Sequence, residues 1–137
     1  MFAGQRVEVL QRNGNRLVGS LVLVVDDDPG SAEAVAGALR DWGARVIVAT
    51  EAYEALTRLT DEPFDAVVLE IALPGASGLD VLEALDAPVP AVLVTALAAR
   101  PVARRARAAG ARVVLRKPVD EAQLVTAVGS AVASHRR

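Results

Sequence analysis

Side chains suited to holding a cation and an oxyanion stand directly after four apolar runs of this chain. Carboxylates a few ångströms apart repel one another, so such a group takes up a proton or recruits a cation. Their oxygens suit a hard cation such as Mg²⁺, which keeps several waters and needs only one or two carboxylates. A lysine offsets remaining negative charge as a compact point charge, and a threonine hydroxyl can hydrogen-bond an oxyanion held beside the metal. The residues are Asp26, Asp27, Glu70, Thr95 and Lys117.

Each acid taken alone has an ordinary structural explanation. Acidic residues at strand ends are common helix N-caps, and Asp28 before Pro29 suits that role. Four separate runs contributing to one group favour a site instead. The lysine adds to this, because Lys117 is the only lysine in a chain whose 15 basic residues are otherwise all arginine. A single lysine in such a chain suggests a position where the planar fork of arginine does not fit.

The composition excludes several classes of protein. With 137 residues, 53% of them hydrophobic, the chain has the material for one compact domain. There is no cysteine, which excludes disulfides, thiolate metal sites and cysteine nucleophiles, and the lone His135 leaves no histidine triad or cluster. No apolar run approaches the roughly 20 residues that span a bilayer. No secretory leader is evident, so we expect a cytoplasmic protein with no membrane partner.

A regular alternation of strands and helices positions the polar residues. Continuous apolar runs predict buried parallel strands, and apolar residues at helical spacing predict amphipathic helices between them. The predicted strands cover residues 21–25, 45–49, 64–69, 91–94 and 112–115, and the helices cover 29–39, 51–59, 79–85, 101–109 and 120–134. This pattern predicts an α/β fold, a flavodoxin-like (βα)5 three-layer sandwich with a parallel five-stranded sheet in the order 2-1-3-4-5. In such sheets the functional site lies beyond the carboxyl ends of the strands.

The first 20 residues differ from the rest. The Asn-Gly pair at residues 13–14 is a strong hairpin signal and would place Leu10 opposite Leu17. A hairpin here would dock on the domain or on a partner. An extension or linker is favoured, because an isolated hairpin is marginal in water. We therefore expect residues 1–20 to form an N-terminal extension and residues 21–137 to form the folded domain.

Five short motifs fall in order along the chain, most of them where a predicted strand ends. They are Leu-Val-Leu-Val-Val-Asp-Asp-Asp-Pro at 21–29, Phe-Asp-Ala-Val-Val-Leu-Glu at 64–70, Leu-Pro-Gly-Ala-Ser-Gly-Leu at 73–79, Val-Thr-Ala at 94–96 and Arg-Lys-Pro-Val-Asp at 116–120. Through them, residues 20–134 resemble the receiver domain of two-component response regulators. The resemblance implies the same sandwich and self-catalysed phosphorylation of an aspartate after the third strand, with Mg²⁺ and a histidine-kinase phosphoryl donor.

The resemblance also implies roles for individual residues. Asp26 and Asp27 match the acidic pair that binds the metal, and Ala72 matches the position whose backbone carbonyl binds it. Lys117 matches the lysine that contacts the phosphoryl group. Thr95 matches the switch hydroxyl that turns toward that group.

The phosphoacceptor position departs from the family, because it holds Glu70 instead of aspartate. The extra methylene moves the carboxylate roughly 1.5 Å further into the pocket, and in-line transfer tolerates little misplacement. We therefore expect Glu70 to accept phosphate poorly and to reach Lys117 or Thr95 instead, imitating part of the phosphorylated state. Val114 replaces the usual Tyr or Phe of the switch, and Ser77 replaces the usual Asp or Asn. With these departures the chain resembles a pseudo-receiver, a degenerate receiver domain that signals by binding.

Three functions compete on this evidence. The favoured one is a stand-alone pseudo-receiver that is not an enzyme and acts by protein–protein interaction. The alternative is a working phospho-receiver of a histidine-kinase phosphorelay, supported by the complete set of other pocket residues. The third is a phosphotransfer enzyme of the haloacid-dehalogenase type, but that class expects Asp-x-Asp followed by Thr or Ser, and here Pro29 follows three aspartates. No glycine-rich loop follows the first strand, which disfavours nucleotide binding.

Charge divides the chain into an acidic and a basic part. Residues 21–98 hold 14 acidic and 3 basic residues, a net charge of −11, whereas residues 99–137 hold 9 basic and 2 acidic residues, a net charge of +7. The arginines of the fourth helix and fifth strand are Arg100, Arg104, Arg105, Arg107, Arg112 and Arg116. In receivers the fourth helix, fifth strand and last helix form the usual output and dimer surface. A solvated arginine-rich face is the plain structural alternative. A partner there would be a histidine kinase, an effector or a second copy, and not nucleic acid, because the aromatic content is 3%.

Overall fold

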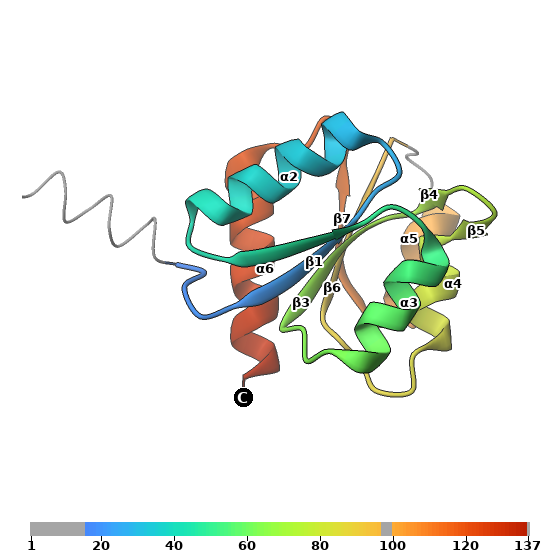
Figure 1. Cartoon of the computed structure of the whole chain (residues 1–137). Coiled ribbons are helices and arrows are strands. Elements are labelled where there is room, and N and C mark those ends of the chain that lie inside the picture. Colours follow the sequence, from blue (N-terminus) through green and yellow to red (C-terminus); the bar gives the residue numbers. More distant parts are fainter. Residues whose placement is uncertain (1–15, 97–99, 137) are drawn as a thin grey trace, which may run out of the picture.

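The computed structural model describes residues 16–96 and 100–136. Its centre is a parallel five-stranded sheet in the order β2-β1-β3-β6-β7 (Figure 1). The strands are β1 (Leu21–Val25), β2 (Arg45–Ala49), β3 (Ala66–Glu70), β6 (Ala91–Thr95) and β7 (Ala111–Arg116). Because β6 and β7 are the fourth and fifth strands of this sheet in chain order, the predicted order 2-1-3-4-5 is confirmed.

Helices cover both faces of the sheet and complete a three-layer sandwich (Figure 1). One face is covered by α2 (Pro29–Asp41) and α6 (Glu121–His135), and the other by α3 (Ala52–Asp61), α4 (Gly78–Ala84) and α5 (Arg100–Ala108). The predicted flavodoxin-like α/β fold is therefore confirmed. None of the helices in the described part of the chain is long and apolar enough to cross a membrane.

Alternation along the strands supplies a core on each side of the sheet. In β1, Val22 and Val24 pack toward α2 and α6, whereas Leu23 and Val25 pack toward α3, α4 and α5. All of β3 and β6 is buried, as continuous apolar runs predict for central parallel strands. The layers therefore hold the carboxyl ends of the strands in fixed positions.

No strand is predicted between residues 69 and 79, but the structure has two there. They are β4 (Ala72–Leu73) and β5 (Ala76–Ser77), which form an antiparallel hairpin. The chain reverses at Gly75, whose φ of +76° favours glycine. Ser77 then caps α4, in a capping box with Asp80. Strands of two residues leave no periodic pattern, which is why the sequence did not reveal them.

The end of the N-terminal extension is part of the packed structure. Leu17 is fully buried among core residues of α2 and α6, and its N–H donates to the Trp42 carbonyl at 2.9 Å. Arg136 donates to the Gly19 carbonyl at 2.7 Å. Residues 16–19 form a turn, and the rest of the predicted hairpin lies outside the described residues.

The two edges of the sheet are β2 and β7. At the β2 edge, Arg40 reaches from α2 and donates a hydrogen bond to the Val46 carbonyl at 3.2 Å. The same guanidinium lies 3.5 Å from Glu33. An arginine therefore covers part of the backbone that an edge strand would otherwise leave open.

Candidate functional site

Parallel pairing brings the predicted site residues to one end of the sheet. Asp26 directly follows β1, Glu70 and Thr95 end β3 and β6, and Lys117 directly follows β7. Burial is nearly complete for the first three, with 2% of Asp26, 5% of Glu70 and 1% of Thr95 exposed. The three side chains of Asp26, Glu70 and Lys117 are in contact, as predicted, and Thr95 ends the neighbouring strand.

Lys117 joins the two buried carboxylates. Its Nζ lies 2.8 Å from Asp26 Oδ2 and 2.6 Å from Glu70 Oε1. The predicted contact of Glu70 with Lys117 is therefore present. Only 20% of the lysine side chain is exposed, so both ion pairs lie in a partly desolvated position where charge-assisted hydrogen bonds are strong.

The remaining carboxylate oxygens are held by backbone amides. Asp26 Oδ1 accepts from the N–H of Asp28 at 3.0 Å, and Glu70 Oε2 accepts from the N–H of Ala72 at 2.9 Å. Every oxygen of the two carboxylates thus accepts a hydrogen bond. Among the described residues, no buried side-chain nitrogen or oxygen lacks a partner, so the pocket is a satisfied network.

The environment of Lys117 favours its charged form. Burial acts to lower the pKa of this lysine, but the hydrogen bonds and charges of Asp26 and Glu70 outweigh burial and raise the pKa above its ordinary value. Lys117 is therefore an ammonium ion at neutral pH. It remains one into the alkaline range.

Gly78 allows the segment after β3 to lie close against the end of that strand. Its N–H donates to the Ile71 carbonyl at 2.7 Å. A Cβ at Gly78 would collide with the Glu70 carbonyl oxygen and press against Leu69. In the sequence Gly78 stands only as part of the motif at 73–79, because its role in close backbone approach depends on tertiary packing.

The other predicted residues lie around this centre. Asp27 is exposed beside Asp26. Asp28 caps α2 by accepting from the Gly30 N–H at 3.1 Å, which confirms the predicted N-cap. The Thr95 carbonyl accepts from the Lys117 N–H at 2.9 Å, which ties the ends of β6 and β7 together.

The oxygen atoms at the end of the sheet are of the type that a hard cation prefers. Asp26, Asp27 and the Ala72 carbonyl offer only oxygen ligands, which Mg²⁺ prefers. In the described residues, however, no three acidic, histidine or cysteine side chains are grouped as a metal cluster. Lys117 instead neutralises Asp26 and Glu70 directly. A metal ion at this site would therefore share Asp26 with the lysine.

A second ion-pair group, which the sequence did not predict, links α4 to α5. Arg105 Nη2 lies 2.8 Å from Asp80 Oδ1 and 2.7 Å from Glu83 Oε1. The Ser77 N–H and the Arg105 guanidinium hold the pKa of Asp80 below its usual range. Glu83 and Asp80 in turn raise the pKa of Arg105. The partners are more than 20 residues apart, so no local pattern reveals them.

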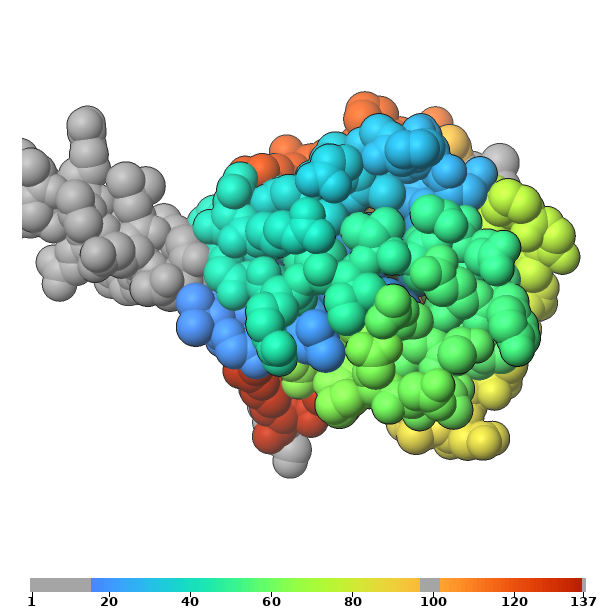
Figure 2. Space-filling view, viewed as in Figure 1, coloured from blue at the N-terminus to red at the C-terminus, as the bar shows by residue number. Residues whose placement is uncertain are grey.

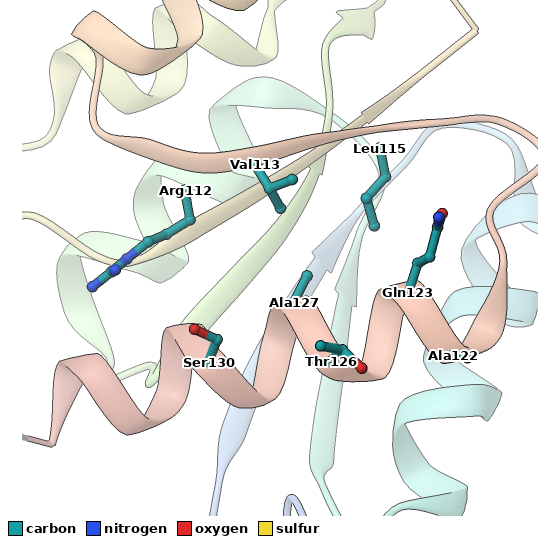
Figure 3. A pocket seen from close by; sticks show the side chains of 8 residues that line it. All are labelled: Arg112, Val113, Leu115, Ala122, Gln123, Thr126, Ala127 and Ser130. Atoms are coloured by element: carbon teal, nitrogen blue, oxygen red, sulfur yellow. The ribbon is translucent and has the colours of Figure 1, made fainter.

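An open groove of about 570 Å³ lies between β7 and α6, away from the acidic pocket. Figure 3 shows Val113 and Leu115 pointing from β7 toward the helix, with Ala127 facing them. The groove is lined by Arg112, Val113, Leu115, Ala122, Gln123, Thr126, Ala127 and Ser130. Its floor is mainly apolar, and Arg112 brings positive charge to its rim.

Comparison with known families agrees with this fold. The family model of the response regulator receiver domain matches residues 22–129. The chain belongs to this family. Receiver domains are signalling domains, generally without enzymatic activity, that interact with histidine kinases and effector domains and typically bind Mg²⁺ at the phosphorylation site.

Individual relatives are longer than this receiver. It is 34% identical over 115 residues to the sensor histidine kinase GacS of Pseudomonas protegens, covering 78% of this chain and 12% of the relative. It is 31% identical over 118 residues to the transcriptional regulatory protein ZraR of Salmonella typhimurium, covering 84% and 27%. The chain thus spans only a small part of these relatives.

A solved structure supports the same assignment. The CheY-like receiver domain protein of Methanospirillum hungatei superposes with a TM-score of 0.80 at 26% identity, covering 85% of this chain and 96% of that one. The likeness extends over nearly the whole described fold.

Proposed function

We propose that this receiver domain is a pseudo-receiver, which acts by binding a protein partner and does not accept a phosphoryl group on Glu70. The observation that carries the proposal is the 2.6 Å contact between Glu70 Oε1 and Lys117 Nζ. The lysine that receivers direct at the phosphoryl group is here directed at the side chain in the acceptor position.

The carboxylate of Glu70 is poorly placed to act as a nucleophile. Attack on phosphorus requires an oxygen lone pair aimed in line with the leaving group. Oε1 is engaged by the lysine, and Oε2 accepts from the Ala72 N–H at 2.9 Å. The side chain is also longer than aspartate by roughly 1.5 Å. A displacement of that size is expected to slow an in-line transfer by about a hundredfold or more.

The same contact supports partial mimicry of the phosphorylated state. In a phosphorylated receiver the lysine binds the phosphoryl group, whereas in this domain it binds Glu70. Glu70 carries one negative charge, compared with about −1.5 to −2 for a phosphoryl group at neutral pH. The proposal is therefore a domain held near one signalling state, with less charge in the pocket than a phosphorylated receiver has.

The residue at the switch position of β7 supports a domain that does not change between two signalling conformations. Val114 takes the position where receivers usually carry a Tyr or Phe ring. It packs against the core on the side of α3, α4 and α5. A short β-branched side chain has no ring to rotate between an inward and an outward position.

Mg²⁺ remains a candidate ligand of the pocket. Asp26, Asp27 and the Ala72 carbonyl are the groups that would hold it, and when bound it would neutralise charge on the carboxylates and on a phosphoryl group. Lys117 already donates to Asp26 at 2.8 Å. We therefore propose that this domain binds Mg²⁺ more weakly than a receiver whose metal ligand is free of the lysine.

The proposed partner surface consists of α5, β7 and α6. Arg104, Arg107, Arg112 and Arg116 are exposed on it, and the apolar groove of Figure 3 lies within it. Aligned positive charge beside an apolar groove suits an acidic protein surface with apolar side chains at its centre. A histidine kinase or an effector domain in the cytoplasm is the class of partner that this proposal names.

The second candidate function is a working phospho-receiver. It is favoured by the buried Asp26 and Thr95 and by Lys117, which pairs with Asp26. On this reading the lysine releases Glu70 when a metal ion and a phosphodonor arrive. Glu70, or an acid beside it, would then accept the phosphoryl group.

Intact-mass spectrometry after incubation with Mg²⁺ and a small-molecule phosphodonor distinguishes the two functions. The wild type is compared with Glu70→Asp and with Glu70→Gln, which keeps the length of the side chain but removes its charge. We expect only Glu70→Asp to gain a phosphoryl group. That result also establishes that the rest of the pocket is competent.

Two outcomes contradict the proposal. Phosphorylation of the wild type that is lost in Glu70→Gln identifies a working receiver with an unusual acceptor. A partner that binds the wild type only after phosphodonor treatment does the same. Binding of a partner in the absence of phosphodonor, weakened by Arg104→Glu with Arg107→Glu, is the result that the pseudo-receiver predicts.

A further inference from the structure

We propose that two copies of this chain associate through α3 of one and α5 of the other. The α5 patch consists of Ala103, Arg104, Arg107 and Ala108. The α3 patch consists of Tyr53, Glu54, Thr57, Arg58, Asp61 and Glu62. This pairing differs from the α5–β7–α6 surface proposed above for other partners, because it also requires α3.

The α5 patch offers the guanidinium groups of Arg104 and Arg107 at the protein surface. All four of its residues are exposed. Arg105 on the same helix is held by Asp80 and Glu83, but within residues 16–96 and 100–136 neither Arg104 nor Arg107 pairs with a carboxylate. The two alanines leave a shallow hollow of about 480 Å³ between the arginines. A ring and a carboxylate can therefore approach together.

The α3 patch offers the complementary groups. Tyr53 has 77% of its surface exposed, more than any other large hydrophobic side chain in the described part of the chain. Asp61 is exposed about two turns further along the same helix, whereas Arg58 is already paired with Glu62 at 3.0 Å. A ring and a carboxylate on one helix suit two arginines, because one guanidinium can stack on the ring while another donates to the carboxylate.

No other segment lies over α3 in Figure 2, where the green surface of the helix is open. The patch forms a hollow of about 450 Å³, close in size to the one on α5. Tyr and Arg are the residue types that contribute most to binding energy at protein interfaces. The two patches thus have complementary charge and complementary chemistry.

The layering lets both contacts form at once. α3, α4 and α5 pack on the same side of the sheet, and α3 and α5 lie at its opposite margins, beside β2 and β7. Because α4 lies between them, a two-fold axis that passes over α4 and runs along these helices would place α3 of each copy on α5 of the other. The result is a closed dimer with two identical contacts, in which the second contact forms within an already joined pair.

The segregation of charge along the chain supports a second copy as the occupant. Residues 21–98 carry −11 and residues 99–137 carry +7, so each copy holds both halves of a complementary pair. Attraction between exposed charges weakens as salt rises, because the screening length falls to about 10 Å at 0.1 M. Self-association of this kind is therefore salt-dependent.

Sedimentation velocity of the full chain tests the proposal without any second protein, so its outcome is independent of the proposed pseudo-receiver function. At low salt we expect the protein to change from mainly monomer to mainly dimer as its concentration is raised about a hundredfold. We expect Tyr53→Ala, and separately Arg104→Glu with Arg107→Glu, to raise the dimer Kd at least about tenfold. Circular dichroism establishes that each variant is folded.

A charge exchange decides which surfaces meet. Asp61→Arg is predicted to lose the dimer, and so is Arg104→Glu with Arg107→Glu, but a mixture of these two variants is predicted to regain it. The matched control is Arg112→Glu with Arg116→Glu, which changes net charge by the same amount on β7 and is predicted to leave most dimer intact. A monomeric wild type, a mixture that stays monomeric, or a loss confined to the β7 control overturns the proposal.

Discussion

Lys117 stands between two acids whose combined charge exceeds its own. Its Nζ donates to Asp26 and Glu70 from a position with 20% of the side chain exposed. Removing one partner of such a group leaves charge buried without compensation. Effects of substitution at this residue are therefore expected to report on the whole pocket.

Stability should depend on pH through Lys117. Its pKa in the folded state lies above the ordinary value of 10.5, so the ion pairs stabilise the fold below that value. The stabilisation is lost as pH rises through the folded-state pKa. We expect the stability difference between wild type and Lys117→Met, from urea unfolding, to be constant from about pH 7 to 9 and to shrink above about pH 11. A difference that stays constant to that pH contradicts this assignment.

Competition between lysine and metal for Asp26 gives a second prediction. In Lys117→Met, Asp26 and Glu70 lose the positive charge beside them, so a divalent cation becomes the compensating charge. We expect Mg²⁺ to bind this variant at least about tenfold more tightly than the wild type, as measured by calorimetry. Asp26→Asn in the same background is the control and should abolish the gain. Equal affinities for wild type and Lys117→Met would mean that the lysine does not compete.

The pocket residues could be found from the sequence, but their pairing could not. Asp26, Glu70, Thr95 and Lys117 each stand at the end of a run that reads as a buried strand, and parallel strands necessarily end together. The network depends on side-chain reach. That the Ala72 N–H holds the second oxygen of Glu70 follows from the turn into β4, which no pattern indicates.

At the level of elements, the approach of α4 to β3 depends on Gly78. Gly78→Ala would place a Cβ against the Glu70 carbonyl, and we expect a loss of about 1 to 3 kcal/mol in the free energy of unfolding. The matched control is Gly37→Ala in α2, where a Cβ meets nothing within 4 Å. Helix propensity predicts that this control is up to about 1 kcal/mol more stable than wild type. Urea unfolding measures both, and equal effects would contradict the close approach.

The turn before β1 contributes a buried side chain from outside the repeating pattern. Leu17 is fully buried against α2 and α6, so Leu17→Ala is expected to cost about 2 to 4 kcal/mol of unfolding free energy. Val18→Ala, at 55% exposure, is the control and should change stability by less than about 0.5 kcal/mol. Thermal or urea unfolding of the two variants tests this. If Leu17→Ala lowered the unfolding free energy no more than the control does, the turn would not be packed into the core.

Sequence patterns located the long elements and missed the short and distant ones. The five strands were expected near their observed positions, although β3 begins at Ala66, two residues later than the run starting at Phe64. Leu17 precedes the first strand and belongs to no periodic run. The ion pairs of Arg105 with Asp80 and Glu83 join two separate helices, α5 and α4. Only the folded structure brings these helices together.

At the scale of the molecule, two cores share one sheet. Each central strand contributes alternate residues to both sides, so neither side can lose its packing while the other keeps its own. We expect cooperative two-state unfolding. Trp42, the single tryptophan, is the C-cap of α2 and packs against the core on that side of the sheet. Its fluorescence reports on that side, whereas circular dichroism reports on all helices. Coincident urea curves from the two signals are predicted, and a separate early transition in either would contradict the shared core.

The guanidinium of Arg40 on the Val46 carbonyl has a consequence for handling this protein in concentrated solution. Amyloid-like growth starts where a row of free amide and carbonyl groups can template another chain. At the β2 edge, the Val46 carbonyl already accepts a hydrogen bond from Arg40, so another chain would have to displace this charged side chain in order to pair there. Arg40→Ala should therefore leave the fold in place and shorten the lag before fibrils form under agitation, a property set by the rim of the sheet and not by its core.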